Sequence, residues 1–325
     1  MDKGKRERKV VVIGAGAVGA TFCYSLAQSG LSDEIAIIDH NQDLAHGQVL
    51  DLSHGQAFFP PVHIHVGSAE DYGDAGVIVM TAGAKQGTGE TRLQLLRRNA
   101  AIIKSVTADI IRENSPAVLV IVSNPVDVLT YVAACESGWE RGRVLGSGTV
   151  LDSARFRSLL SRHCGIDAHN VHGYILGEHG DSEFAAWSMT HLAGMRIDEY
   201  CPVCRKCEDW YKTRKAIERE VRESAYHIID YKGATCFAIG LALLRIVGAI
   251  LRGQRTVLTV SARLEGEYGL TGVCLSVPCV VSERGIDKIV EAKLSPEERG
   301  ALSHSADVLK TAIDSLACVD TMEHQ

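Results

Sequence analysis

A glycine-rich turn close to the amino terminus constrains the fold of this 325-residue chain more than any other stretch. A short β-branched run, Lys9 to Ile13, ends at a glycine, and two more glycines complete the spacing G-x-G-x-x-G. Gly14 permits a tight turn, Gly16 lets a pyrophosphate approach the backbone, and Gly19 allows the next helix to pack closely on the strand. The N–H groups at the start of that helix suit phosphate oxygens. This stretch therefore predicts a dinucleotide-binding fold.

An acidic residue lies where it could select the dinucleotide. A second predicted strand, Glu34 to Ile38, ends at Asp39, about 20 residues beyond Gly19. A carboxylate there accepts hydrogen bonds from the adenosine ribose hydroxyls and repels a 2′-phosphate. The alternative is a glycine-rich turn followed by an unrelated aspartate, but the order of strand, turn and helix favours the first interpretation. We therefore expect NAD rather than NADP as the cofactor.

Strands and helices alternate through the first half of the chain. Runs rich in valine and isoleucine predict strands at residues 63–66, 77–81, 117–122 and 144–145, with helical patterns such as 93–112 and 126–136 between them. This alternation is typical of a parallel, doubly wound sheet, which binds ligands beyond the carboxyl ends of its strands. We predict an α/β, Rossmann-type NAD-binding domain over residues 1–149.

The pattern changes from about residue 150 onward. Ser295, Pro296 and Glu298 predict the capped start of a last helix. Before it we expect a helix, a hairpin around residues 171–176, long helices at 210–231 and 236–252, and antiparallel strands at 256–262 and 273–282. We predict a second, α+β substrate domain over residues 150–325.

Composition argues against several classes of protein. A net charge of −6 argues against nucleic-acid binding, which needs a basic surface. The longest apolar helical stretch, residues 236–251, is too short for a membrane span and contains Arg245. The sequence shows no secretory signal, and most of the ten cysteines lie singly within apolar runs, which suits reduced thiols. We therefore expect a cytoplasmic protein.

A histidine between glycines and carboxylates is the first candidate for chemistry. His179 lies in the stretch GEHGDS, residues 177–182, whose composition also suits a polar surface turn. Its imidazole can donate and accept a proton near neutral pH, as the oxidation of a secondary alcohol requires. The rest of the chain has to decide between the two interpretations.

Other polar residues follow the predicted strands. After the strand at 77–81, the glycine-rich stretch Ala82 to Arg92 suits a mobile lid that carries a cation to an anionic substrate. Asn124 follows the next strand and can offer an amide to a cofactor or substrate. Asp152 and Arg155 lie three residues apart, so the alternative to a catalytic role is a helix-start ion pair.

Six features occur in one order along the chain: GAGAVG, Asp39, TAGAKQGTGETR, VSNPVD, GSGTVLDSARFR and GEHGDS. In this order and spacing they resemble the L-lactate/malate dehydrogenase family, and most of all its NAD-dependent, lactate-specific bacterial members. The resemblance runs from about Lys9 to Lys310. It implies a Rossmann fold, NAD as cofactor, the interconversion of pyruvate and L-lactate, and a homotetramer.

The resemblance implies a role for each residue of the expected catalytic group. His179 matches the residue that transfers the proton, and Asp152 the carboxylate that orients it. Arg155 matches the arginine that grips the substrate carboxylate, and Arg92 the lid arginine that polarises the reacting carbonyl. A planar guanidinium suits a carboxylate because it donates two parallel hydrogen bonds.

Further positions match residues that bind substrate and cofactor. Asn124 matches the asparagine beside the nicotinamide and the substrate oxygen, with a cis bond to Pro125, and Thr235 matches a threonine at the edge of the substrate pocket. Cofactor contacts are implied for Gly14, Gly16, Ala17, Val18, Gly19, Asp39, Gly83, Ala84, Ser105, Val122, Asn124 and Thr149.

Gln86 carries the choice of substrate. It occupies the position whose residue distinguishes lactate from malate enzymes, and the malate enzymes have an arginine there. A neutral amide would leave the second carboxylate of a dicarboxylate unpaired in a closed site, whereas pyruvate has only a methyl group at that end. The adjacent Lys85, on a mobile loop, is expected to stay in solvent. We therefore expect a preference for pyruvate over oxaloacetate.

Two features leave alternatives open. Arg157 and His172 match positions that bind fructose 1,6-bisphosphate in regulated bacterial members, but a surface arginine and a hydrogen-bonded histidine would explain them equally well. Cys201, Cys204 and Cys207 depart from the family pattern. Three thiols lack the fourth ligand of a structural zinc site, so we expect a surface loop with reduced thiols and no metal.

Overall fold

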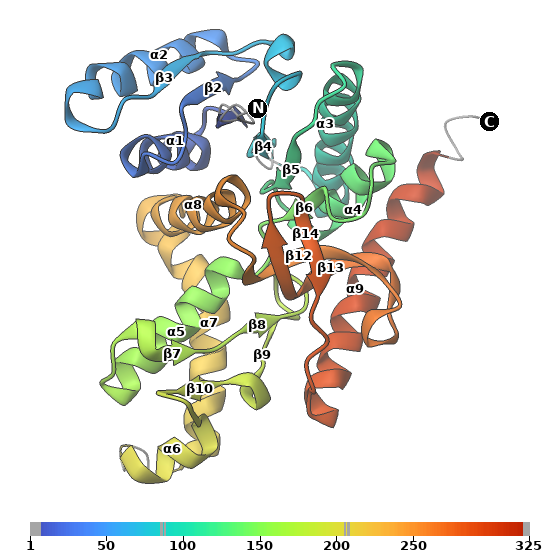
Figure 1. Cartoon of the computed structure of the whole chain (residues 1–325). Helices are drawn as coiled ribbons and strands as arrows, with labels where there is room; N and C mark the ends of the chain where they lie inside the picture. Colours follow the sequence, from blue (N-terminus) through green and yellow to red (C-terminus); the bar gives the residue numbers. More distant parts are fainter. Residues whose placement is uncertain (1–7, 85–86, 88, 205, 207–208, 321–325) are drawn as a thin grey trace, which may run out of the picture. The chain divides into compact units, whose positions relative to one another are not determined.

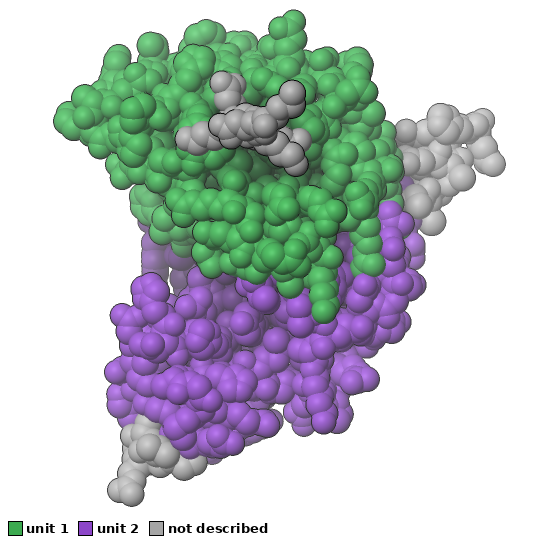
Figure 2. Space-filling model, viewed as in Figure 1, with its two compact units in different colours: residues 1–147, 236–256, 280–288 green, residues 148–235, 257–279, 289–325 purple. Residues whose placement is uncertain are grey.

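The structure of the chain is a computed structural model that describes residues 8–84, 87, 89–204, 206 and 209–320 (Figure 1). The chain forms two compact units (Figure 2). Unit 1 comprises residues 1–147, 236–256 and 280–288, and unit 2 comprises residues 148–235, 257–279 and 289–325. The chain thus returns twice to unit 1 after residue 147, whereas the predicted domains divide it once, after residue 149.

Among the described residues of unit 1, six strands pair in parallel in the order β6-β5-β4-β1-β2-β3. They are β1 (Lys9–Ile13), β2 (Glu34–Ile38), β3 (His63–Val66), β4 (Val77–Met80), β5 (Val118–Ile121) and β6 (Val144–Gly146). β1, β4 and β5 are buried along their whole length, and their residues apart from Lys9 are apolar, as a sheet covered on both faces requires. The predicted Rossmann-type fold is confirmed.

The described residues of unit 1 form five α-helices, and one of them, α8 (Phe237–Arg252), comes from the second half of the chain. α8 packs against α1 so closely that a methyl group on Gly240 would lie 2.9 Å from Cγ2 of Thr21. This contact explains why residues 236–256 belong to unit 1. The helices are α1 (Ala17–Ser29), α2 (Gln42–His54), α3 (Arg92–Arg112), α4 (Val126–Ser137) and α8 (Phe237–Arg252), with short 3-10 turns η1 (Gln56–Phe58) and η2 (Ala69–Tyr72).

Unit 2 combines helices with short antiparallel strand pairs. Its helices are α5 (Val150–Cys164), α6 (Ile197–Cys204), α7 (Trp210–Lys232) and α9 (Pro296–Asp320). Its core gathers apolar side chains of α5, α7 and the short strands, among them Phe156, Leu160, Val171, Trp187, Leu192 and Val221. Further along the chain, β12 (Thr256–Glu265), β13 (Thr271–Ser282) and β14 (Gly285–Ile289) lie in the sheet order β14-β13-β12, and most of β14 belongs to unit 1. Among the described residues, no helix is both long and apolar enough to cross a membrane.

The prediction of a hairpin around residues 171–176 is wrong. β7 (Val171–His172) pairs with β10 (His191–Leu192), and β8 (Ile175–Leu176) pairs with β9 (Phe184–Ala185), so the two strands do not pair with each other. Gly173 between them packs on the ring of Phe156, which a methyl group would approach to 2.8 Å. The true hairpin joins β8 to β9, and its turn is the stretch that carries His179.

Hydrogen bonds to two other elements hold this turn in place. Gly177 exchanges backbone hydrogen bonds of 3.0 and 2.9 Å with Ser276 of β13. The hydroxyl of Ser305, on α9, donates to the carbonyl oxygen of Ser182 at 2.8 Å. α9 itself begins as predicted, because Ser295 and Glu298 form a reciprocal capping box. The turn is therefore tied to a strand and to a helix of unit 2.

Gly19→Ala is expected to destabilise unit 1 by about 1–3 kcal/mol. A methyl group there would lie 1.9 Å from the carbonyl oxygen of Gly14, a backbone atom that cannot rotate aside. Gly47→Ala is the matched control, because Gly47 also lies within a helix but has no atom of the described residues within 4 Å of the added methyl group. That control should gain up to about 1 kcal/mol. Urea unfolding followed by circular dichroism would compare them, and equal effects would contradict the packing argument.

Candidate active site

The glycine turn of unit 1 has the geometry that a dinucleotide requires. Gly14 has φ +107°, and a methyl group on it would lie 2.6 Å from the backbone nitrogen of Ala82. A methyl group on Gly16, in contrast, would meet no atom of the described residues within 4 Å. Two of the three glycines are thus needed for packing, and the middle one leaves open space at the start of α1. The residues present fit a bound pyrophosphate.

Asp39 is held in position by the same turn. Its Oδ2 accepts a hydrogen bond of 2.7 Å from the backbone N–H of Ala15, and its Oδ1 accepts one of 2.8 Å from Asn41. The side chain directly follows β2, beside the carboxyl end of β1. A carboxylate fixed at that place suits ribose hydroxyl groups and opposes a 2′-phosphate.

A buried asparagine that sequence analysis did not identify connects two segments at the carboxyl edge of the parallel sheet. The amide of Asn99, on α3, accepts a hydrogen bond of 2.8 Å from the N–H of Ala84 and donates one of 3.0 Å to the carbonyl oxygen of Asn124. The bond from Asn124 to Pro125 is cis, as the resemblance implied. The only sequence signal for Asn99 is an amide within a helix whose neighbouring residues, Leu96 and Ala100, are apolar and buried. It ties together the segments that follow β4 and β5.

The predicted lid is described in part. Arg92 is exposed and is the first residue of α3, whose start is capped by Thr91 and Gln94 in a capping box. Glu90 accepts hydrogen bonds from the N–H of Gly87 at 2.8 Å and from Arg98 at 2.9 Å. Lys85 and Gln86 lie outside the described residues.

Unit 2 brings together three of the four predicted catalytic residues. The Nδ1 atom of His179 lies 2.6 Å from Oδ2 of Asp152, and Nη1 of Arg155 donates to Oδ1 of Asp152 at 2.6 Å. Asp152 is 1% exposed, whereas 27% of the His179 side chain is exposed. The helix-start ion pair and the histidine contact therefore exist at the same time, one on each oxygen of the carboxylate.

The charge state of this carboxylate follows from its neighbours. Burial acts to raise the pKa of Asp152, but the charges and hydrogen bonds of His179 and Arg155 outweigh it and hold the pKa below its ordinary value. A carboxylate on Nδ1 keeps the proton of a neutral imidazole on that nitrogen. The Nε2 atom of His179 is then the atom that can accept or donate a proton in a reaction.

A second buried acid stands beside this group and was missed by sequence reasoning. Glu183 is 5% exposed, and one of its carboxylate oxygens, one of Asp152 and one ring nitrogen of His179 all lie within 4.8 Å of one another. Burial, and then the charge of Asp152, raise the pKa of Glu183 to about 9. Its position directly after the GEHGDS stretch and directly before β9 was the available signal. Glu183 is therefore uncharged at neutral pH.

The other predicted site residues divide between the two units. In unit 1, Ala17 and Ser105 are exposed on α1 and α3, Val18 is half-buried, and Gly83 and Val122 follow β4 and β5. In unit 2, Thr149 precedes α5 with its hydroxyl bonded to the carbonyl oxygen of Ile175, and Thr235 is half-buried after α7. Each unit thus carries its own group of predicted residues.

The two open features of the sequence also lie in unit 2. Arg157 donates to the carbonyl oxygen of Ala168 at 2.9 Å, and its buried Nε has no hydrogen-bond partner among the described residues. His172, on β7, is exposed. Cys201 is buried in α6, so the prediction of a surface loop is wrong for this residue. The side chain of Cys204 and all of Cys207 lie outside the described residues.

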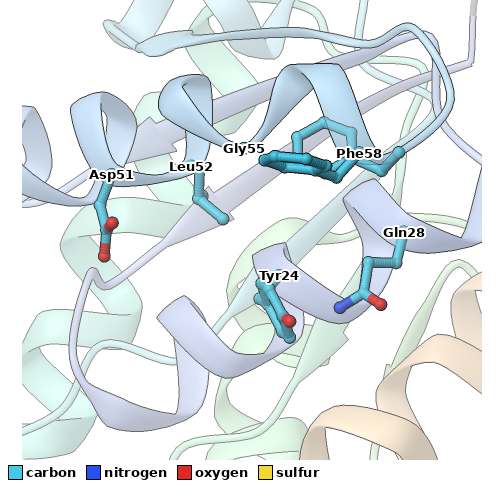
Figure 3. Close-up of a pocket in the computed structure, with 7 residues that line it drawn as sticks. Tyr24, Gln28, Asp51, Leu52, Gly55 and Phe58 are labelled. Atoms are coloured by element: carbon cyan, nitrogen blue, oxygen red, sulfur yellow. The ribbon is translucent and has the colours of Figure 1, made fainter.

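A separate pocket of about 220 Å³ lies in unit 1 between α1, α2 and η1 (Figure 3). Tyr24 and Gln28 of α1 lie across it from Leu52 and Phe58. It contains none of the residues predicted to bind cofactor or substrate. The pocket therefore does not belong to the candidate active site.

The sequence matches two family descriptions over nearly its whole length. Residues 8–146 match the lactate/malate dehydrogenase NAD binding domain, and residues 149–318 match the lactate/malate dehydrogenase alpha/beta C-terminal domain. An L-lactate dehydrogenase of Treponema denticola is 58% identical over 314 residues, which cover 96% of this chain and 99% of that protein. An L-lactate dehydrogenase of Thermoanaerobacter pseudethanolicus is 52% identical over 309 residues, covering 95% and 99%.

Solved structures agree with these matches. A lactate dehydrogenase from a Medee basin deep-sea metagenome library has a TM-score of 0.94 at 41% identity, covering 96% of this chain and 99% of that chain. The minor L-lactate dehydrogenase of Enterococcus mundtii in its ligand-bound form has a TM-score of 0.93 at 40% identity, with the same coverage. The chain belongs to the lactate/malate dehydrogenase family, whose amino-terminal domain binds NAD.

Proposed function

We propose that the chain is an NAD-dependent L-lactate dehydrogenase that interconverts pyruvate and L-lactate. The observation that carries this proposal is the group in unit 2 in which Asp152 holds both His179 and Arg155 at 2.6 Å. It offers a proton donor and acceptor beside a guanidinium that suits a carboxylate. The names of the relatives support the same activity.

His179 is the proposed proton carrier. Hydride removal from the alcohol carbon of lactate leaves a hydroxyl proton, which passes to Nε2 of His179, and pyruvate reduction returns it. Asp152 steadies the imidazolium that forms, because its ionised carboxylate lies on the opposite ring nitrogen. When bound, NAD supplies the hydride acceptor in one direction and, as NADH, the hydride donor in the other.

The two arginines have different proposed tasks. Arg155 holds the carboxylate of the substrate, and its bond to Asp152 through Nη1 fixes the plane of its guanidinium. Arg92 stabilises negative charge that develops on the carbonyl oxygen. Asn124 contributes an amide next to the reacting carbon, and Thr235 borders the pocket. Gln86, which is uncharged, is the residue next to the methyl group of pyruvate in this proposal.

Glu183 acts as an uncharged neighbour of the proton carrier. With its pKa raised to about 9, it adds no second negative charge beside Asp152 at neutral pH. A second carboxylate there would hold the proton on His179 more tightly and slow its transfer to pyruvate. We therefore infer that burial of Glu183 keeps the proton affinity of His179 near the value the reaction needs.

Regulation and assembly complete the proposal. Arg157 and His172 contribute to an anion site for fructose 1,6-bisphosphate, a view supported by the buried, unpartnered Nε of Arg157 among the described residues and by the exposure of His172. The enzyme is a cytoplasmic homotetramer with a small-molecule substrate and neither a nucleic-acid nor a membrane partner. In this proposal the cysteines within residues 201–207 bind no metal.

The direct test is NADH oxidation with pyruvate, followed by absorbance. His179→Asn should lower kcat/KM for pyruvate by about 10²–10⁴, the usual contribution of a general acid. His169→Ala, which changes a 94% exposed histidine of unit 2, is the matched control and should keep normal activity. In the unmodified enzyme, pyruvate reduction should slow as the pH rises and His179 loses its proton, whereas lactate oxidation should speed up. Near-normal turnover of His179→Asn would refute the mechanism.

Gln86→Arg is expected to shift the preference from pyruvate towards oxaloacetate. An arginine would pair with the second carboxylate, and in a closed site such a pair changes the ratio of the two kcat/KM values by at least about 100-fold. Gln86→Leu is the control, since it removes the amide without adding a charge and should gain no oxaloacetate activity. Equal kcat/KM for both acids in the unmodified enzyme would contradict the assignment of the substrate.

Glu183→Gln should make stability less dependent on pH. Because the folded pKa of about 9 lies above the ordinary value of 4.5, the folded state binds the extra proton between these limits. The contribution of this proton to the free energy of unfolding is complete below the pKa of the unfolded state. It is lost as the pH rises towards 9, at up to about 1.4 kcal/mol per pH unit. The variant should therefore gain stability relative to the parent between about pH 6 and pH 8 in urea unfolding.

Glu297→Gln, at an exposed position of α9, is the control for this experiment. Its free energy of unfolding should equal that of the parent at about pH 6 and at about pH 8. Activity provides a second readout. Because both side chains at residue 183 are uncharged at neutral pH, kcat/KM for pyruvate should have the same pH profile in parent and variant. A profile displaced to lower pH in Glu183→Gln would show that Glu183 is ionised.

A further inference from the structure

A group of three metal-ligating side chains lies in unit 1, at the ends of the strands opposite those that carry the cofactor residues. His63 and His65 occupy alternate positions of β3, the outermost strand of the parallel order, so they point to the same face. Their rings stack with centroids 4.8 Å apart, and His63 is exposed. Two imidazoles two residues apart on one strand can approach one metal ion together.

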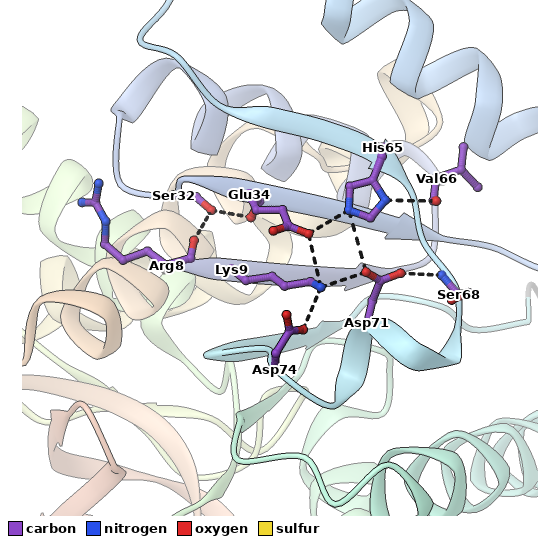
Figure 4. A network of polar contacts seen from close by, with 9 residues as sticks. All are labelled: Arg8, Lys9, Ser32, Glu34, His65, Val66, Ser68, Asp71 and Asp74. Carbon is purple, nitrogen blue, oxygen red and sulfur yellow. Dashed lines mark hydrogen bonds and ion pairs between the residues drawn. The ribbon is translucent and has the colours of Figure 1, made fainter. Parts of the chain in front are cut away.

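Glu34 completes the group from the neighbouring strand. It is the first residue of β2 and pairs in register with His63, while Ala36 pairs with His65. Its Oε1 lies 3.0 Å from Nε2 of His65 (Figure 4). One ligand atom from each of Glu34, His63 and His65 lies within 4.8 Å of the other two. The set is therefore compact before any ion is bound.

The hydrogen bonds of His65 orient it as a ligand. Its Nδ1 lies 3.1 Å from the carbonyl oxygen of Val66, which can only accept, so this nitrogen carries a proton. Its Nε2 faces Oε1 of Glu34 at 3.0 Å. A histidine that donates its second ring nitrogen to a backbone carbonyl is the usual arrangement around protein-bound metals.

The charges around this group are three carboxylates and one ammonium group, which shares Oε1 of Glu34 with His65. Lys9 contacts three carboxylates, with Nζ at 3.2 Å from Glu34, 2.8 Å from Asp71 and 2.7 Å from Asp74 (Figure 4). Three carboxylates thus surround one ammonium group, and the neighbourhood keeps an excess of negative charge. Asp71 lies on the same side as His65, with Oδ1 at 3.8 Å from Nε2.

We propose that Glu34, His63 and His65 bind a divalent transition-metal ion of the zinc class. Two imidazoles and one carboxylate match the ligands that zinc prefers, whereas magnesium and calcium prefer oxygen alone. Tetrahedral ligands bound at about 2.0–2.1 Å lie about 3.3 Å apart. The 3.0 Å between His65 and Glu34 is close to this value, and the exposed His63 can rotate to meet the ion. Water completes the coordination.

The site is separate from the residues of the proposed reaction. Glu34 begins β2, whereas Asp39, at the cofactor edge, follows the end of the same strand. The proposed ion therefore stabilises the outer strands of unit 1 and takes no part in hydride or proton transfer. This inference does not depend on the proposed function.

Calorimetric titration of the full chain with zinc chloride tests the proposal. His63→Ala should bind one zinc ion fewer than the parent, or bind it at least tenfold more weakly. His63 is exposed, so the variant should fold normally, which its circular dichroism spectrum without metal would confirm. His304→Ala, at an exposed position of α9, is the matched control and should bind zinc as the parent does. Thiols and the Asp152 group are unchanged in both variants, so the difference isolates the site.

Thermal unfolding gives a second readout. Zinc should raise the Tm of the parent and of His304→Ala by mass action, and should raise it less in His63→Ala. His65→Ala should reproduce the loss of binding. Identical zinc stoichiometry and affinity in parent, His63→Ala and His65→Ala would overturn the proposal, as would an equal loss in His304→Ala.

Discussion

One buried charge organises the chemistry of unit 2. Asp152 is almost fully enclosed, and each of its oxygens lies 2.6 Å from a nitrogen, one of His179 and one of Arg155. Removing either partner would leave a buried carboxylate poorly compensated, at a cost of about 3–5 kcal/mol. The same two contacts fix the direction of the imidazole and of the guanidinium. Stability and the proposed reaction therefore depend on one ion group, and a substitution there cannot affect only one of them.

The second acid shows how two carboxyl groups of one site come to differ. Asp152 has two nitrogen partners that hold its pKa low, whereas burial and the charge of Asp152 raise the pKa of Glu183 to about 9. Because both acids lie close to His179, a single negative charge faces the imidazole at neutral pH. Had both ionised, their repulsion at this depth would have weakened the fold. The neutral form of Glu183 is thus a consequence first of its burial and then of the charge on Asp152.

The sequence predicts best what depends on neighbouring residues. The strand ending at Ile13, the glycine turn and the cap at Ser295 each lie within one short window, and the structure confirms them. The cis bond before Pro125 followed only from family resemblance. Asn99 and Glu183 were missed because their importance arises where distant segments meet, as in the bond from Asn99 to Asn124, 25 residues away. The hairpin error has the same cause, since β7 takes its partner from beyond β8 and β9.

The register of the parallel sheet separates the two proposed sites of unit 1. Neighbouring parallel strands begin at one edge and end at the other, so Glu34 and His63 meet at the first edge, and Asp39 lies beside the glycine turn at the second. The five residues of β2 span about 17 Å at 3.3 Å per residue. The proposed ion and the carboxylate expected to select the cofactor therefore lie near opposite ends of one buried strand.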